Sequence, residues 1–503
     1  MSARPPVTAP RADSVAASAT PFRVPWREVL GVLAMSLAWA LLVRPGPLSL
    51  PYFWDEADVY APGAKWLADH DLNPTPGHFP DDWSRGHPQL LYMLAAFAFR
   101  LFGPGPAVGH ALIVPFTALA LTATYVLGAE RAGRLVGVGA ALLLATSPLF
   151  LSMGAFLLPE MPLTALTALA LVFTSRGQYV AAACVGVGLV GLKETGIGPP
   201  IAITGGLVFE ALRHRAREGT PLRAALRPLI VSLLPVLALA AFFLWQRATA
   251  GYYVFPHHQH LFTDRAFGLA NAVTVFPSIF FWHGRWVMCA AAGLSLIVLL
   301  ARRSWPTSLR ADATSVAIAL LLLGNAVFFA KMFWLERYAL PVHPGVCVLL
   351  SALVFEAART LPLRLRAPVA AVPCVAACVM GLLSLRVPGE APEHTFAFAD
   401  VVESHRDAYT RIARGGLADP VVVTTWPMTT ELREPWLGFV SAPLRSVHPD
   451  LLASHAGWRP EVVLVDPTTH ERDRLRALAR ESGLRLRTTV RHGAAPALEI
   501  WQP

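Results

Sequence analysis

Charged residues are scarce in this chain. Asp, Glu, Lys and Arg make up 15% of its 503 residues, whereas hydrophobic residues make up 54%. A soluble domain carries roughly 25% charged residues, so the composition excludes an ordinary soluble protein and predicts an α-helical polytopic membrane protein. The net charge of +9 reflects arginines in the loops between apolar runs, as membrane proteins show on their cytoplasmic side. It therefore does not indicate a nucleic-acid partner.

Cysteine is also rare, and all five cysteines lie in apolar runs. None stands in a polar loop, which excludes a disulfide framework and a thiolate metal site. The first 25 residues lack an apolar core followed by a cleavage site. Residues 1–27 are therefore interpreted as a disordered cytoplasmic tail before an uncleaved first span.

Apolar runs of near-spanning length recur between residues 28 and 386, the predicted membrane domain. A helix needs about 20 residues to cross a bilayer. The runs predict about eleven transmembrane helices, at residues 28–44, 106–128, 134–152, 162–175, 178–192, 196–212, 228–247, 284–301, 313–330, 340–357 and 367–386.

One further run, residues 88–103, is short, contains Arg100 and ends in Gly-Pro-Gly-Pro. If it is an interfacial helix, the arginine clusters between spans all fall on one side, as the positive-inside rule requires. This topology places the N-terminus on the cytoplasmic side, and we expect the membrane to be a bacterial-type plasma membrane. It also gives a large first extracytoplasmic loop at residues 45–105 and an extracytoplasmic C-terminal region.

The same topology brings the ionisable residues at span ends to the extracytoplasmic side. They are Asp55, Glu56, Asp58, His78, Asp81, Asp82, Arg85, His87, Glu160, Lys193, Glu194, His257, His258, His260, Lys331, Glu336 and Arg337. Charges beside hydrocarbon lose hydration that lipid cannot replace, so this bias predicts a functional site on the outer face.

Asp55 and Glu56 are adjacent carboxylates that follow the first span directly. In a poorly hydrated site, like charges raise each other's pKa, and one of the two would then accept a proton near neutral pH. Phe53 and Trp54 suit the interfacial aromatic position and would hold the pair at headgroup depth. The alternative is that both acids end a helix in water.

Three other residues at span ends are candidate site residues, and the two cations among them suit a phosphate. Glu160 is a lone carboxylate between two apolar spans, although an acid at a helix N-terminus has the same appearance. Lys193 could bind a phosphate, or it could simply extend its charged end into the lipid headgroup region. Arg337, followed by Tyr338, is the stronger phosphate candidate because its planar guanidinium can bind two oxygens.

The histidines leave metal binding open. A divalent metal could be bound by His257, His258 and His260 together with His78 or His87. The spacing contains no tight ligand pair, so a structural or hydrogen-bonding role is favoured and no cofactor is expected to be required.

Residues 390–503 change in character and predict a small extracytoplasmic α/β domain. The runs 421–425, 462–465, 484–490 and 498–501 read as strands, and Glu471 to Ser482 reads as a helix. This region has no glycine-rich phosphate loop and no evident triad, so it is interpreted as a cap or packing module.

The motifs at the span ends, and the order in which they follow one another, resemble those of the membrane-embedded C-type (GT-C) glycosyltransferases. The resemblance is to the family 39, protein O-mannosyltransferase and aminoarabinose-transferase group in particular. The resemblance covers residues 28–385 and rests on Asp55-Glu56, Gly86-His87-Pro88, the Pro-acid-x-Pro turn at Glu160, Lys193, and Arg337-Tyr338-x-Leu340-Pro341. Two positions depart from the family pattern. The family often has an aspartate where this chain has Glu160, and often a second proline where this chain has Gln89.

The resemblance implies a polyprenyl-phosphate-linked sugar as donor and a hydroxyl or amine of a protein, glycolipid or polysaccharide as acceptor. Asp55 would take the acceptor's proton, and Glu160 would orient the substrate. Lys193, Arg337 and Tyr338 would face the donor phosphate, with inversion at the anomeric carbon. Some relatives bind zinc, but its ligands are not evident here.

Two other functions remain open at this stage. A secondary transporter would place ionisable residues near the middle of the membrane in paired halves, and no internal repeat is present. A non-catalytic polyprenyl-lipid binding or scaffold protein of the same fold would show the same motifs.

Overall fold

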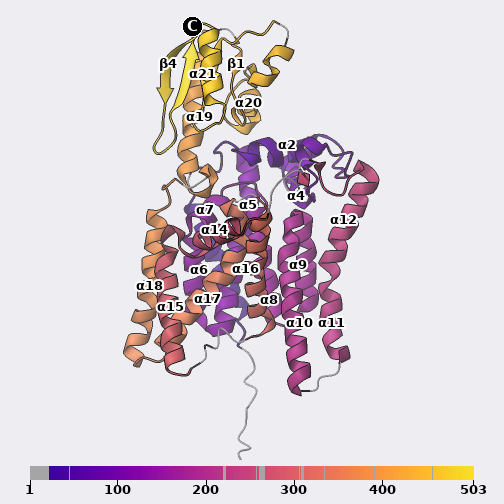
Figure 1. The fold of residues 1–503 in the computed structure, drawn as a ribbon, viewed down its shortest axis with the longest axis vertical. Coiled ribbons are helices and arrows are strands. Elements are labelled where there is room, and N and C mark those ends of the chain that lie inside the picture. The colour runs from indigo at the N-terminus through magenta and orange to yellow at the C-terminus, as the bar shows by residue number, and fades with distance from the viewer. Residues whose placement is uncertain are drawn as a thin grey trace, which may run out of the picture.

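A bundle of helices carries a small α/β domain at one end (Figure 1). The computed structural model describes residues 22–44, 46–218, 222–256, 258–259, 267–304, 306, 311–332, 335–388, 391–417, 419–455 and 457–503. The arrangement confirms the predicted fold class, a helical polytopic protein with a small C-terminal sheet domain. Most of the predicted tail, residues 1–21, lies outside the described residues.

The bundle consists of the helices between Trp26 and Leu383. Their bounds are α1 Trp26–Leu42, α2 Ala61–Asp69, α3 Asp81–Ser84, α4 Leu90–Phe102, α5 Pro106–Ala132, α6 Arg134–Ala145, α7 Pro148–Met153, α8 Glu160–Ser175, α9 Tyr179–Leu192, α10 Gly198–Glu218, α11 Leu222–Ser232, α12 Leu234–Ala250, α14 Leu269–Phe280, α15 Arg285–Ala301, α16 Ala313–Lys331, α17 His343–Ala358 and α18 Leu363–Leu383.

Helix length and hydropathy identify a multi-pass membrane protein. Seven helical segments of the described residues are long and apolar enough to span a membrane: Pro106–Ala132, Glu194–Arg217, Pro228–Ala250, Trp282–Ala301, Ala313–Lys331, Glu336–Ala358 and Leu363–Leu383. Four shorter apolar helices accompany them: α4, α6, α8 and α9.

Each predicted span coincides with helix, but one prediction needs correction. The span predicted at residues 134–152 consists of two helices, α6 and α7, separated at Thr146 and Ser147. Pro148 stands in the first turn of α7, where its missing N–H costs nothing, whereas inside a continuous helix it would break a hydrogen bond.

Close helix contact in the bundle depends on small residues. Gly128 of α5 and Gly137 of α6 face each other so closely that a Cβ on Gly128 would lie 2.9 Å from the Gly137 Cα. Gly133, with φ of 104°, forms the turn between these two helices, a conformation that favours glycine.

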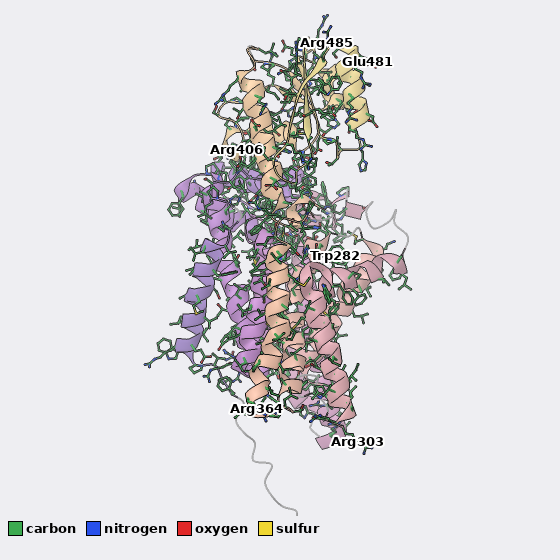
Figure 2. The ribbon with its side chains drawn as sticks, turned by 90° about the vertical axis from the view of Figure 1, so that its left-hand side faces the viewer. Trp282, Arg303, Arg364, Arg406, Glu481 and Arg485 are labelled. Atoms are coloured by element: carbon green, nitrogen blue, oxygen red, sulfur yellow. The ribbon has the colours of Figure 1, made fainter. Side chains whose placement is uncertain are left out.

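The two ends of the bundle differ. Figure 2 places Arg303 and Arg364, which belong to two of the predicted basic clusters, at the end away from the α/β domain. The run predicted as an interfacial helix forms α4, which packs against α2. Both lie at the end that bears the domain (Figure 1).

The C-terminal domain is a mixed sheet with helices. Its elements are α19 Ala397–Arg414, β1 Val422–Val423, α20 Met428–Arg433, β2 Ser446–Val447, β3 Val462–Val465, α21 Arg472–Glu481, β4 Arg485–Val490 and β5 Leu498–Gln502. The strand order is β2-β1-β3-β5-β4, with β1 parallel to β2 and β3, and β5 antiparallel to β3 and β4. The predicted strands and helix are present; β2, only two residues long, was not predicted.

The hydrophobic core continues from the bundle into this domain. Phe53, Phe156 and Phe398 belong to one buried cluster that also contains residues of β1, β3 and β5. Side chains of the first loop and of α19 pack in the same core, so the domain packs directly on the end of the bundle.

Candidate functional site

Glu56 joins the first loop to the loop before α8. Its side chain is fully buried, and its carboxylate accepts hydrogen bonds from the backbone N–H of Phe53 (3.2 Å) and of Leu157 (2.6 Å). His110 Nε2 lies 2.9 Å from the same carboxylate. Leu157 is three residues before Glu160, so Glu56 holds together the two loops that carry Asp55 and Glu160.

Arg337 lies at the centre of three carboxylates from separate parts of the chain. It belongs to the turn Glu336–Val342 before α17 and is 2% exposed. Its Nη2 donates to Asp55, its Nη1 lies 3.2 Å from Glu393 Oε1, and its Nε lies 3.9 Å from Glu160 Oε1. These contacts join the first loop, the start of α8 and the segment after α18.

Lys193 is the second cation of this group. It caps the C-terminal end of α9, and its Nζ lies 3.3 Å from Glu160 Oε1. The same Nζ lies 4.7 Å from the centre of the Tyr338 ring, and the Arg337 guanidinium lies 5.5 Å from that ring. One contact network therefore joins Asp55, Glu160, Lys193, Arg337 and Tyr338. Glu56, which the sequence also assigned to catalysis, lies outside this network and contacts backbone N–H groups and His110.

The electrostatics of Asp55 differ from the sequence-based prediction. Burial alone would raise the pKa of Asp55, but the charge and hydrogen bond of Arg337 outweigh it and lower the pKa below its ordinary value. The prediction that Asp55 and Glu56 raise each other's pKa is wrong for Asp55. The two carboxylates point to different partners, Asp55 to a guanidinium and Glu56 to backbone N–H groups.

The predicted substrate-site residues lie around this network. Arg85 Nη2 lies 2.8 Å from Asp58, which is three residues after Asp55. His87 Nδ1 lies 2.8 Å from Glu194 Oε2, next to Lys193. The His87 ring lies 5.1 Å from that of His258. His257 and His260 lie outside the described residues.

The aromatic residues before Asp55 contact protein. Phe53 is 1% exposed and stacks on Phe398 of α19 with ring centres 6.4 Å apart. Trp54 has φ of 57° and meets the Trp426 ring edge to face at 4.7 Å. The prediction that Phe53 stands at an interfacial aromatic position is wrong, because the C-terminal domain covers it.

Sequence reasoning named Glu336 as a span-end charge but missed the buried residues that surround it next to Arg337. Glu336 is fully buried, with His394 Nδ1 3.5 Å, Arg285 Nη2 3.7 Å and His283 Nε2 3.8 Å from its carboxylate. Burial lowers the pKa of His394 to about 4 despite this carboxylate. Glu393 and His394 follow the last span closely, so the rule applied to other span ends could have found them.

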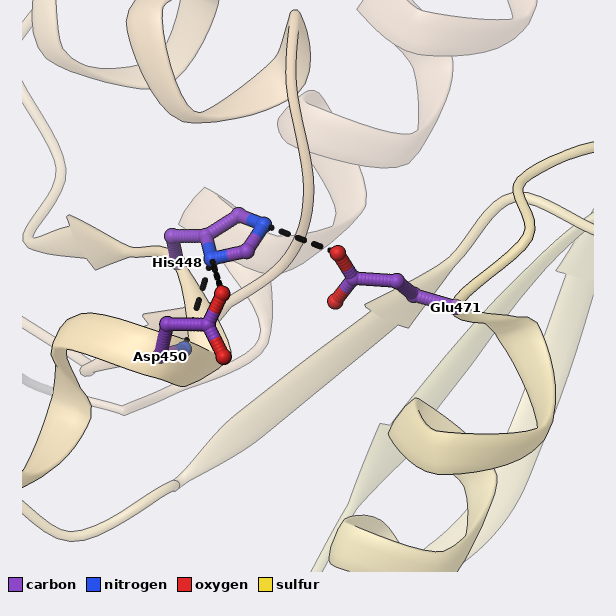
Figure 3. A group of neighbouring side chains, drawn as sticks. All are labelled: His448, Asp450 and Glu471. Atoms are coloured by element: carbon purple, nitrogen blue, oxygen red, sulfur yellow. Dashed lines mark hydrogen bonds and ion pairs between the residues drawn. The ribbon is translucent and has the colours of Figure 1, made fainter.

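One group of three side chains in the described part of the chain has the geometry of a metal site, and it lies elsewhere. His448, Asp450 and Glu471 meet in the C-terminal domain, with His448 3.4 Å from Asp450 and 3.3 Å from Glu471 (Figure 3). Arg474 lies 2.6 Å from Asp450 and 3.5 Å from Glu471, so these carboxylates already have a cation.

The sequence matches no family model and no curated protein. The structure, however, resembles that of ArnT from Cupriavidus metallidurans bound to undecaprenyl phosphate, with a TM-score of 0.59, 15% identity, and coverage of 95% of this chain and 98% of that one. The apo structure of the same protein gives a TM-score of 0.57 and 14% identity, covering 94% and 97%.

An archaeal oligosaccharyltransferase, AglB from Archaeoglobus fulgidus in complex with an inhibitory peptide and a dolichol-phosphate, also resembles this structure. The TM-score is 0.50 and the identity 14%, with coverage of 87% of this chain and 69% of that one. ArnT and AglB are both GT-C glycosyltransferases. At these identities the likeness is one of fold, and the chain has the fold of the GT-C membrane glycosyltransferases.

Proposed function

We propose that this chain is an inverting glycosyltransferase that moves a sugar from a polyprenyl-phosphate carrier to a hydroxyl or amine of an acceptor. The observation that carries the proposal is the network in which Asp55, Glu160, Lys193 and Arg337 meet. The fold adds support, because ArnT binds undecaprenyl phosphate in one of the matched structures and AglB binds a dolichol-phosphate in another.

Asp55 is proposed as the base. Its side chain is 24% exposed, whereas Arg337 and Glu160 beside it are each 3% exposed, so an acceptor can reach Asp55 from the solvent side. The lowered pKa of Asp55 keeps the carboxylate ionised at neutral pH. It can then take the proton of the acceptor group as that group attacks the anomeric carbon.

Arg337 and Lys193 are proposed to bind the donor's phosphate. A phosphate is already a good leaving group, so the reaction needs cations that stabilise its growing charge rather than a general acid. Arg337 offers a planar set of donors for phosphate oxygens, and Lys193 adds a point charge close to the same Tyr338 ring. A single displacement on the face opposite the phosphate inverts the anomeric carbon.

The location follows from the same proposal. The end of the bundle that carries the network also carries the C-terminal domain (Figure 1). Arginines at the other end fit a cytoplasmic side under the positive-inside rule. We therefore propose that transfer takes place on the extracytoplasmic face of a bacterial-type plasma membrane, to a protein, glycolipid or polysaccharide.

Asp55→Asn tests the proposal. The amide keeps the shape of the side chain but cannot accept the proton, so sugar transfer should fall by roughly 10²- to 10⁴-fold while binding of undecaprenyl phosphate persists. Asp69→Asn is the matched control, because Asp69 pairs with Lys65 on the exposed surface of α2. Unchanged transfer by the Asp55 variant would remove Asp55 from catalysis.

The assay itself separates the enzyme from a non-catalytic lipid-binding protein. Membranes containing the wild-type chain are incubated with radiolabelled polyprenyl-phosphate sugars, and products are sorted by extraction into protein, lipid and polysaccharide fractions. Label that moves into one fraction identifies the acceptor class. Binding of the donor without transfer to any fraction would favour the scaffold function.

A further inference from the structure

Glu393 is a buried carboxylate that no motif identifies. It lies in the turn Pro392–His394 between α18 and α19, and its side chain is fully buried. Its Oε1 lies 3.2 Å from Arg337 Nη1, whereas its Oε2 has no hydrogen-bond partner among the described residues. The Ser152 hydroxyl of α7 donates to the Glu393 carbonyl and fixes the turn against the bundle.

The charges around Arg337 do not balance. The carboxylates of Asp55, Glu160 and Glu393 share two cations, Arg337 and Lys193. When all are ionised, the group carries one negative charge in excess. A phosphodiester would add another, and like charges close together in a poorly hydrated site repel one another. The donor phosphate therefore needs one carboxylate to leave or to take up a proton.

Glu393 is the carboxylate held least firmly. Glu160 begins α8 and lies close to both cations. Asp55 contacts Arg337, and the positive charges of Arg85 and Lys193 also stabilise its ionised form. Glu393 has Arg337 as its cation, and burial raises its pKa above the ordinary value in spite of that contact.

A donor group on Arg337 is also without a partner. Arg337 Nε is buried and makes no hydrogen bond to the described residues, while Nη1 and Nη2 are both taken by carboxylates. A phosphate that binds the guanidinium through two oxygens needs two neighbouring nitrogens. Nη2 carries two N–H groups, so release of Glu393 lets a phosphate bind across Nη1 and Nη2 while Asp55 keeps one N–H of Nη2.

We propose that Glu393 competes with the donor's phosphate for Arg337, and that binding of the phosphate releases the turn Pro392–His394 from the bundle. This inference rests on the proposed function and adds a regulatory step to the same site. The turn leads directly into α19, whose Phe398 packs against Phe53 and Phe156. Donor binding therefore changes the position of the C-terminal domain over Asp55.

Glu393→Gln tests the competition. Binding of undecaprenyl phosphate to the purified full-length chain is compared in wild type, this variant and Glu481→Gln, an exposed control on α21 (Figure 2). Removing the competing charge should tighten binding about tenfold in the Glu393 variant alone. Undecaprenol, which has the same tail without phosphate, should bind all three equally. Equal or weaker binding of the phosphate by the Glu393 variant would overturn the inference.

A second measurement uses the wild-type chain. Hydrogen exchange of backbone amides in residues 391–399 should become faster with undecaprenyl phosphate and stay unchanged with undecaprenol. If wild type binds the phosphate but exchange there stays the same or slows, only this inference is wrong. If wild type does not bind undecaprenyl phosphate at all, the proposed function is wrong and the inference falls with it.

Discussion

At the scale of single residues, Arg337 determines what its neighbours can do. It is almost completely buried, and each of its outer nitrogens contacts a carboxylate. A buried charge without partners costs several kcal/mol, so Arg337 and its carboxylates depend on one another for stability. The shape of the guanidinium matters as much as its charge, because its donors lie on three nitrogens in a fixed plane and point toward carboxylates from different parts of the chain.

Arg337→Lys should therefore act on both binding and stability. An ammonium keeps the charge but cannot contact Asp55 and Glu393 together, so we expect donor affinity to fall by roughly 10- to 100-fold and unfolding in detergent to occur several degrees lower. Titration with undecaprenyl phosphate and thermal unfolding measure the two effects. Arg476→Lys, at a partly buried pair with Glu499 in the C-terminal domain, is the control. Equal affinity in both variants would show that charge alone suffices.

The pH dependence of transfer should report Asp55. Because its pKa is lowered, Asp55 stays ionised as pH falls and loses its charge, and the stability that this charge contributes, only below its ordinary range. We expect no acid limb from Asp55 between about pH 8 and pH 5. In Arg337→Gln, burial acts without the opposing cation, so the acid limb of the residual activity should move to higher pH. An acid limb at the same pH in both proteins would contradict the assignment.

At the scale of elements, Glu56 organises two loops. Each of its oxygens accepts from a different backbone N–H, one in the first loop and one before α8. Two consecutive carboxylates thus have different surroundings, because neighbouring residues on a helix point in different directions. Asp55 faces the network, while Glu56 faces the protein interior and fixes where Asp55 and Glu160 lie.

Glu56→Gln should loosen this connection. An amide has one acceptor oxygen, so either Phe53 or Leu157 loses its hydrogen-bond acceptor, which costs about 1–3 kcal/mol for a buried group. We expect lower thermal stability together with reduced transfer, measured on the same preparation. Glu403→Gln, at the exposed pair with Arg406 on α19, should change neither. Full stability in the Glu56 variant would show that its contacts are dispensable.

At the scale of the whole molecule, the C-terminal domain takes part in building the site. The sequence predicted a cap or packing module, and the packing is present in the shared core of Phe53, Phe156 and Phe398. Beyond packing, the segment entering the domain supplies Glu393 to Arg337. Trp426 of the domain also meets Trp54, the residue before Asp55.

Phe398→Ala should therefore impair transfer although Phe398 is not among the charged groups. Removing a fully buried phenyl ring costs about 3–5 kcal/mol and leaves Phe53 poorly supported. We expect a large drop in thermal stability and a loss of transfer that exceeds the loss of folded protein. Leu486→Ala on exposed β4 should stay within about 0.5 kcal/mol of wild type. Full transfer by folded Phe398→Ala protein would limit the domain to a passive role.

The sequence by itself determined the class of fold and the residues of the network. Long apolar runs can be satisfied only as buried or lipid-facing helices, so hydropathy located the long helices of the bundle, seven of which among the described residues are long and apolar enough to span a membrane. A charged side chain at the end of a membrane span loses hydration, which costs free energy whatever the rest of the fold. The sequence alone could therefore select Asp55, Glu160, Lys193 and Arg337 as candidates. Short apolar runs located the strands of the terminal domain, apart from the short β2.

Tertiary structure decided how these groups affect one another. The pKa of Asp55 depends on Arg337, which is 282 residues away in sequence, and no local pattern encodes that distance. The same holds for Glu393 and for the burial of Phe53 under α19. A sequence pattern indicates which environment suits each segment: lipid, water or another part of the protein. Only packing of the whole chain decides which partner lies within the few ångströms over which charges and hydrogen bonds act strongly.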